Sequence, residues 1–283
     1  MELGTVEPIR VGGGLRFAEG IDFNRDGTLF CIDAEGDSIW YMPPGERLLP
    51  WKVTGGQPNG SRFGRDGHLF VADRGCRAIL RFEIETEARS VYADHWPGGE
   101  FQGPNDLVFG PDGTLYFTDP VNSTPDNRIG AVYAVAPDGA VTCLASGLMF
   151  PNGLAVTPDG NALVVSDTHT GILHGYLLDP TSGFPEIEPL IQLEAANPPP
   201  KETGVDGIRF AVGGNLYAAH FGTGKIRVIS PDGVIVASHP AGGPTPTNLA
   251  FWRDDLYITE GRSGSIYRLE IGVEEHPPFM RPW

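Results

Sequence analysis

The sequence predicts an all-β protein, a six-bladed β-propeller, and three observations support this prediction. A segment like residues 103–120, with its turn and its apolar positions in place, occurs six times along the 283 residues. The copies begin 40 to 54 residues apart, which is the period of a four-stranded propeller blade. The 39 glycines and 26 prolines suit many strands joined by tight turns, and no amphipathic helix pattern free of Gly and Pro is found.

Each copy is expected to open with a β-hairpin that has a polar residue at its leading end. In residues 103–120, Asn105 and Asp106 precede a short apolar strand at 107–109. A tight turn follows in which Gly113 supplies a positive φ, and residues 115–118 return as the second strand. The leading residues of the six copies are Glu19, Asn59, Asn105, Asn152, Asp206 and Thr247.

The outer strands follow in the same order in each copy. Third strands are predicted at 38–41, 78–81, 131–134, 172–176, 225–228 and 265–268, and fourth strands at 47–53, 90–93, 141–144, 189–193 and 234–237. This leaves the sixth blade one strand short. Residues 7–11 have no blade of their own, so we expect them to pair with residues 264–271 and to close the ring. Residues 1–283 would then form a single propeller domain.

Charge and cysteine content narrow the possible partners. The net charge of −16, without a cluster of Lys and Arg, argues against nucleic-acid binding. No N-terminal targeting signal and no apolar run near the roughly 20 residues of a membrane span is found, so we expect no membrane partner. Cys31, Cys76 and Cys143 form no CxxC pair and are interpreted as buried or edge thiols, which indicates a cytoplasmic protein. The oligomeric state is not predicted.

The leading residues become a candidate site when they are considered together. In a propeller, the first strands begin around one end of the central channel. Any one of these polar residues alone would most often cap its own turn. Two carboxylates, Glu19 and Asp206, crowded with the amides of Asn59, Asn105 and Asn152 would cost free energy unless a cation lay between them. Because the set has no His or Cys, we predict one hard divalent ion such as Ca²⁺, with Zn²⁺, Mg²⁺ or Mn²⁺ as alternatives.

Four blocks of the sequence also carry a resemblance to a known family. The blocks are Ala18-Glu19-Gly20, Gly103-Pro104-Asn105-Asp106, Phe150-Pro151-Asn152-Gly153-Leu154 and Val205-Asp206-Gly207. With the six repeats around them, they resemble the senescence marker protein, gluconolactonase and regucalcin family of six-bladed propellers over essentially the whole chain. The related diisopropylfluorophosphatase and paraoxonase propellers use a similar set of Glu, Asn, Asn and Asp.

The resemblance implies a catalytic divalent metal ion on the channel axis. It assigns Glu19, Asn152 and Asp206 as metal ligands, and Asn105 as a further ligand or a substrate contact. Members of the regucalcin type have an Arg two residues before the residue that matches Asn105, where it helps to hold a sugar lactone, but this chain has Gly103 there. Asn59, in the second blade, is a candidate substrate contact.

On these grounds we expect a metal-dependent lactonase that opens a sugar-acid lactone or a similar small lactone. The metal would polarise the carbonyl, Asp206 would act as the base, and Asn105 and Asn59 would orient the substrate. Two alternatives stay open, a phosphotriesterase-like hydrolase of the diisopropylfluorophosphatase type and a non-catalytic calcium-binding propeller. His220 stands where the other copies have an acid, and either a channel or ion-binding role or a hydrogen-bonded supporting role is open for it.

Overall fold

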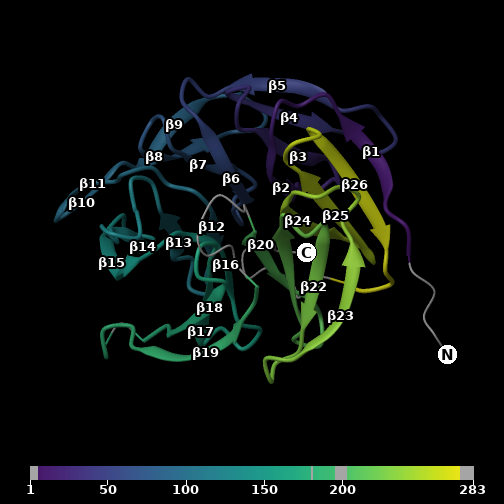
Figure 1. Ribbon diagram of the computed structural model, residues 1–283. Coiled ribbons are helices and arrows are strands. Elements are labelled where there is room, and N and C mark those ends of the chain that lie inside the picture. The colour runs from purple at the N-terminus through teal and green to yellow at the C-terminus, as the bar shows by residue number, and fades with distance from the viewer. Residues whose placement is uncertain (1–5, 180, 195–202, 275–283) are drawn as a thin grey trace.

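Six antiparallel sheets of four strands each are arranged around a central axis, as the ribbon diagram shows (Figure 1). The computed structural model describes residues 6–179, 181–194 and 203–274. Among these residues, no helix has the length and the apolar character needed to cross a membrane. The predicted all-β, six-bladed propeller is confirmed.

The first three blades are built from strands that follow one another along the chain, each starting with its innermost strand. Blade 1 contains β2 Ala18–Phe23, β3 Leu29–Asp33, β4 Ser38–Met42 and β5 Leu49–Val53. Blade 2 contains β6 Pro58–Phe63, β7 Leu69–Asp73, β8 Ala78–Phe82 and β9 Arg89–Ala93. Blade 3 contains β12 Leu107–Phe109, β13 Leu115–Asp119, β14 Gly130–Val135 and β15 Val141–Leu148.

The last three blades repeat this order until the chain closes. Blade 4 contains β16 Pro151–Val156, β17 Ala162–Asp167, β18 Ile172–Leu177 and β19 Glu186–Gln192. Blade 5 contains β20 Gly204–Phe210, β21 Leu216–Phe221, β22 Lys225–Ile229 and β23 Ile235–Pro240. Blade 6 contains β24 Pro246–Trp252, β25 Asp255–Glu260 and β26 Ser265–Glu270, and its fourth strand is β1 Ile9–Gly13.

The N-terminal strand closes the ring, as predicted. β1 pairs antiparallel with β26, with Ile9 opposite Arg268, and the Nε of Arg10 donates to Ser265 Oγ at 3.0 Å. The pairing joins the first and last blades through the backbone and covers the outer edge of β26. One short hairpin was not predicted, β10 His95–Trp96 with β11 Gly99–Glu100, which is inserted between blades 2 and 3.

The apolar core lies between the blades. The described residues form six apolar clusters, and each cluster draws its side chains from two neighbouring blades. Between blades 1 and 2, for example, the Phe30 and Phe63 rings meet edge to face with centroids 5.3 Å apart. Burying a side chain of this size contributes about 1.5–3 kcal/mol. Because these contacts stabilise the ring between its blades, polar side chains can occupy the axis.

Acidic residues at the ends of the second strands fix where the first strands begin. Asp33 Oδ1 accepts from the backbone N–H groups of Phe17 at 3.1 Å and of Gly36 at 3.0 Å. Asp119 accepts from the N–H groups of Gln102 and Gly103 in the same way. Such bonds satisfy loop donors that would otherwise be left unpaired, and they hold each strand entry in place.

Candidate functional site

The candidate residues lie where the first strands begin. Glu19 in β2, Asn59 in β6, Asn152 in β16 and Asp206 in β20 are all buried. Asn105 is buried just ahead of β12. Since the first strands of neighbouring blades contact one another around the axis, these five residues belong to the inner part of their blades.

A β-bulge occurs at four of these positions. The pairing of β2 with β3 shifts between Ala18 and Ile21, so that Glu19 stands outside the regular ladder. The same shift occurs around the candidate residues of β6, β16 and β20. A bulge leaves residues unpaired and re-aims their side chains, and bulges are frequent beside active sites. The bulges explain how candidate residues with regular strand on both sides can direct their side chains away from the regular alternation of the sheet.

Small residues let neighbouring first strands approach closely behind the candidate residues. A Cβ atom at Gly60 would lie 2.5 Å from Asp106 Oδ1, and one at Gly207 would lie 2.7 Å from Asn248 Cγ. The N–H of Gly60 donates to the Asn105 carbonyl at 2.7 Å. Glycine is therefore required at both positions, because any side chain would meet the neighbouring blade.

The two carboxylates of the site influence each other. The pKa of Glu19 is raised to about 8, mainly because burial disfavours its charged form, and Asp106 adds to this effect while the Arg74 cation opposes it. The pKa of Asp206 is raised well above its ordinary value by burial first and by the negative charge of Glu19 second. Glu19 in blade 1 and Asp206 in blade 5 are thus brought within electrostatic reach of each other, as the sequence predicted.

Unpartnered oxygens make this group a good fit for a cation. Glu19 Oε2 and Asn105 Oδ1 are buried and have no hydrogen-bond partner. Asn152 donates through Nδ2 to Thr168 Oγ1 at 3.1 Å, which leaves its Oδ1 to act as a ligand. Across the described residues, no three His, Cys, Asp or Glu side chains are grouped to hold a metal ion, so amide oxygens are needed to complete a ligand set. Carboxylate and amide oxygens are the ligands that Ca²⁺ prefers.

Two further leading residues, Asn59 and Thr247, also have partners within the chain. Asn59 Oδ1 accepts a hydrogen bond from Nη2 of Arg74. Thr247 Oγ1 donates to the Ala18 carbonyl of the next blade at 2.7 Å. Asn59 therefore keeps its amide N–H groups for another acceptor, while Thr247 joins blades 6 and 1.

Arg74 is a residue of the site that the sequence reading missed. It lines a cavity of about 390 Å³ together with Glu19, Asn59, Phe17 and Gln57. In the sequence it stands directly after the acidic residue that ends the second strand, a place that His220 takes in blade 5. The equivalent residues are Ala34, Arg74, Pro120, Thr168, Phe221 and Gly261. Only Arg74 among these six is charged.

Buried polar side chains fill the channel beyond the candidate residues. Asn248 Nδ2 donates to Asp106 Oδ2 at 3.2 Å. The buried Arg62 donates to the Leu107 carbonyl at 3.0 Å, and the buried Arg209 to that of Leu249 at 2.7 Å. These bonds tie the inner strands of neighbouring blades together.

His220 has a supporting role in the structure. Arg227 Nε donates to its Nδ1 at 3.2 Å, so Nε2 carries the proton and donates to the Glu194 carbonyl at 2.7 Å. Burial lowers the pKa of His220, which favours the neutral ring. Because both nitrogens have partners within the chain, the hydrogen-bonded role is the one observed.

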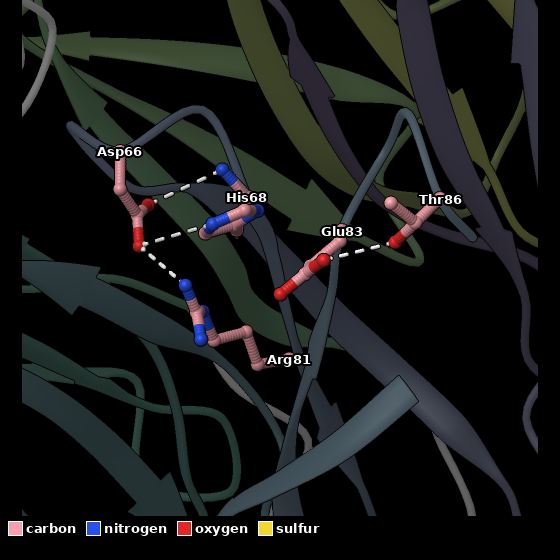
Figure 2. A network of polar contacts seen from close by, with 5 residues as sticks. All are labelled: Asp66, His68, Arg81, Glu83 and Thr86. Atoms are coloured by element: carbon pink, nitrogen blue, oxygen red, sulfur yellow. Dashed lines mark hydrogen bonds and ion pairs between the residues drawn. The ribbon is translucent and has the colours of Figure 1, made fainter. Parts of the chain in front are cut away.

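A second charged network in blade 2 lies away from the site. Asp66 Oδ2 lies 3.3 Å from Arg81 Nη2 and 3.8 Å from His68 Nε2. Figure 2 shows how the three side chains face one another. Asp66 is in the turn that follows β6, whereas Asn59 lies near the start of that strand. Partly exposed ion pairs of this kind contribute about 0–1 kcal/mol, and this network is at the opposite end of the blade.

Comparisons with known proteins agree with this picture of the fold. The sequence model of a family described as SMP-30/Gluconolactonase/LRE-like region matches residues 17–262. A gluconolactonase of Zymomonas mobilis is 35% identical over 258 residues, which are 83% of this chain and 69% of that protein. The diisopropyl-fluorophosphatase of Loligo vulgaris is 27% identical, with 95% of this chain and 94% of that protein covered.

The fold is also that of a solved propeller. The crystal structure of a calcium-binding protein, regucalcin from Agrobacterium tumefaciens, superposes with a TM-score of 0.79 at 20% sequence identity. The superposition covers 95% of this chain and 95% of that chain.

Proposed function

The chain belongs to the SMP-30/gluconolactonase/LRE-like family, and from this membership we propose that it is a metal-dependent hydrolase of a sugar-acid lactone or a similar small lactone. The observation that carries the proposal is the buried pair Glu19 and Asp206, whose pKa values are both raised, beside the unpartnered Oδ1 of Asn105. Of the two, Glu19 lines the cavity that also contains Arg74 and Asn59, and a group whose pKa is strongly perturbed inside a pocket is typical of an active site. The similarity to a gluconolactonase over 83% of the chain supports lactones as the substrate class.

We assign Glu19, Asn152 and Asp206 as the residues that hold the ion, with Asn105 as a further ligand. Two carboxylates balance a divalent charge, and their oxygens and those of the amides suit Ca²⁺ better than Zn²⁺. Mg²⁺, Mn²⁺ and Zn²⁺ remain alternatives for the reconstitution experiment. A divalent ion bound by these residues supplies polarisation of the lactone carbonyl, an effect worth several kcal/mol.

The side chains of the protein do the rest of the chemistry. Asp206 accepts the proton of the attacking water as the water oxygen bonds to the carbonyl carbon. The bond from that carbon to the ring oxygen then breaks, and the ring oxygen takes up a proton to become the hydroxyl of a hydroxy acid. A carboxylate can take up this proton, whereas the amides of Asn105 and Asn152 cannot, so Asp206 is the residue assigned as the base.

The amides hold the substrate in place. Asn59 has its Oδ1 bonded to Arg74, so its Nδ2 is the group that can donate to a substrate oxygen. Asn105 is buried beside it in the next blade and provides a second amide. Correct positioning of a small substrate accounts for a large part of the rate in many enzymes.

The three cysteines, which are free thiols in the structure, fit a reducing compartment. We therefore propose a cytoplasmic location. The measurement is labelling of the thiols in intact cells, where a reduced protein is expected.

A phosphotriesterase-like hydrolase is the second candidate, since the diisopropyl-fluorophosphatase relative spans 95% of the chain. The test compares kcat/KM for δ-gluconolactone and an aliphatic lactone with kcat/KM for paraoxon and diisopropyl fluorophosphate, with and without chelator. We expect a higher kcat/KM for the lactones than for the phosphorus substrates, and we expect the chelator to abolish the lactonase activity. Preference for the phosphorus substrates would favour the second candidate, and metal binding without turnover of any substrate would indicate a non-catalytic propeller.

A further inference from the structure

Arg74 is held at its base by the strand end of blade 2. The carboxylate of Asp73 accepts from the N–H groups of Gln57 and Cys76, both at 2.8 Å, and from Thr54 Oγ1 at 2.7 Å. The N–H of Arg74 itself donates to the Gln57 carbonyl at 2.9 Å. The backbone from which this side chain enters the cavity is therefore fixed on both sides.

The guanidinium group of Arg74 has N–H donors that are available to a ligand. A guanidinium carries five N–H donors, and the bond to Asn59 uses one of them. The Nε atom of Arg74 is buried and has no hydrogen-bond partner. The cavity wall around it also contains Gln57 and the exposed Glu35. Such a wall offers both donors and acceptors to a small ligand that is rich in oxygen atoms.

Charge balance argues for a neutral ligand. The positive charge of Arg74 acts on both Glu19 and Asp206, so it lies close to the proposed ion ligands. When a divalent ion balances these two carboxylates, the guanidinium is left to interact with the ligand. Glu35 and Asp37 at the cavity wall disfavour an anionic substrate, whereas hydroxyl groups can donate to acids and accept from the guanidinium.

Blade 3 has no space for a basic side chain at Gly103, two residues before Asn105. A Cβ atom at Gly103 would lie 2.6 Å from Val121 Cγ2, so a longer side chain would have to displace Val121. The position of Arg74, in contrast, is one from which a residue reaches the leading residue of its own blade. Thr168, at the same position in blade 4, contacts Asn152 in this way.

We propose that Arg74 is the specificity-determining residue of the site, which selects polyhydroxylated lactones by donating hydrogen bonds to their hydroxyl oxygens. This inference rests on the proposed function, because it concerns the substrate of the same cavity. In this proposal the positively charged side chain of the substrate site comes from blade 2, because Gly103 in blade 3 leaves no space for one. Arg74 also orients Asn59, so its loss should have a small effect on every lactone and a larger, additional effect on lactones that carry hydroxyl groups.

The test uses two lactones with the same ring size, δ-gluconolactone with hydroxyl groups and δ-valerolactone without them. In Arg74→Met, KM for δ-gluconolactone is expected to rise about 10- to 100-fold, the loss of one or two charge-assisted hydrogen bonds. KM for δ-valerolactone is expected to rise much less than KM for δ-gluconolactone, and kcat is expected to change to a similar, small extent for both lactones, because both lose the bond that orients Asn59. Arg74→Lys restores part of the loss for δ-gluconolactone because the charge is kept without the planar geometry. Lys52→Met, which removes a positive charge from an exposed pair with Glu87, is the control.

A Ca²⁺ titration of each variant measures the affinity for the ion, which the activity assays do not report. Arg74→Met is expected to bind Ca²⁺ at least as tightly as the wild type, because a neighbouring positive charge is removed. An equal rise of KM for both lactones, or a loss of Ca²⁺ affinity in Arg74→Met, would overturn the inference while the lactonase activity of the wild type stands. Failure of the wild type to open either lactone would instead refute the proposed function, and the inference with it.

Discussion

Asn248 of blade 6 donates a hydrogen bond of 3.2 Å to Asp106 of blade 3, although 142 residues separate them in sequence. Blades 3 and 6 are opposite each other in a ring of six, so this bond crosses the channel axis. Burial raises the pKa of Asp106, while Arg62 and the bonds from Leu107 and Asn248 act against that rise. The carboxylate is thus stabilised by neighbours from three other positions on the inner strands.

Replacing Asn248 by Leu should lower the free energy of unfolding. The change removes one bond to a buried carboxylate, which costs about 1–3 kcal/mol. Urea unfolding measures it as a lower midpoint with the same slope. Asn161→Leu, in an exposed turn, is the control. A midpoint equal to that of the wild type would mean that water or another side chain replaces Asn248 without cost.

Deleting residues 1–12 should destabilise the ring, because it removes most of β1 and exposes the edge of β26. Aggregation or a large drop in the melting temperature is expected. A deletion of residues 1–5, which leaves β1 intact, is the matched control. If the longer deletion melts within a degree or two of the full chain, the closure contributes little to stability.

Metal binding should depend on pH through Glu19, since protons compete with the ion for a carboxylate whose pKa is raised to about 8. Below pH 8, calcium affinity should fall by at least about tenfold per pH unit, because each ion bound displaces the Glu19 proton. Glu19→Gln should bind more weakly at every pH and show a shallower dependence. Calorimetric titration between pH 6 and 9 measures both effects.

The metal-free protein offers a second readout of the same group. Glu19 has a higher pKa in the folded chain than its ordinary value of 4.5, so the folded state binds the proton more tightly. Its contribution to stability is therefore present at low pH and is lost as the pH rises toward 8.

In the metal-binding experiment, a metal content and a calcium affinity of Glu19→Gln equal to those of the wild type would show that the ion is held elsewhere.

Asp206→Asn separates a metal ligand from a base. With saturating metal, a residue that serves only as a ligand should recover most of its activity, whereas loss of a base should leave kcat lower by about 100-fold or more. Asn152→Ala is the control, because an amide accepts no proton at neutral pH and added metal should restore its activity. Near wild-type turnover of Asp206→Asn at saturating metal would assign the base to another group.

The fold could be predicted from the sequence because its information is local and repeated. Turn residues such as Gly113, which has a φ of 89°, and alternating apolar residues recur at a fixed period, so each copy supports the others. The short hairpin formed by β10 and β11 has two residues in each strand, too few for any alternation to be visible.

The site could be predicted only in part, for a physical reason. Glu19 and Asp206 share a repeat position, which predicted that they lie near each other, and the negative charge of Glu19 does raise the pKa of Asp206. The roles assigned to them remain predictions. Arg74 and the Asn248 bond to Asp106 depend on how long side chains fill the channel, which no repeat pattern contains.

The central claim, metal-dependent lactone hydrolysis, is tested most directly by pH-stat titration of acid release from δ-gluconolactone. The protein is stripped of metal with a chelator, assayed, and assayed again after addition of Ca²⁺, Mg²⁺, Mn²⁺ or Zn²⁺. We predict that the stripped protein releases acid no faster than the buffer alone and that Ca²⁺ restores the full rate. An undiminished rate in the stripped protein, or no rate with any of the four ions, would contradict the account.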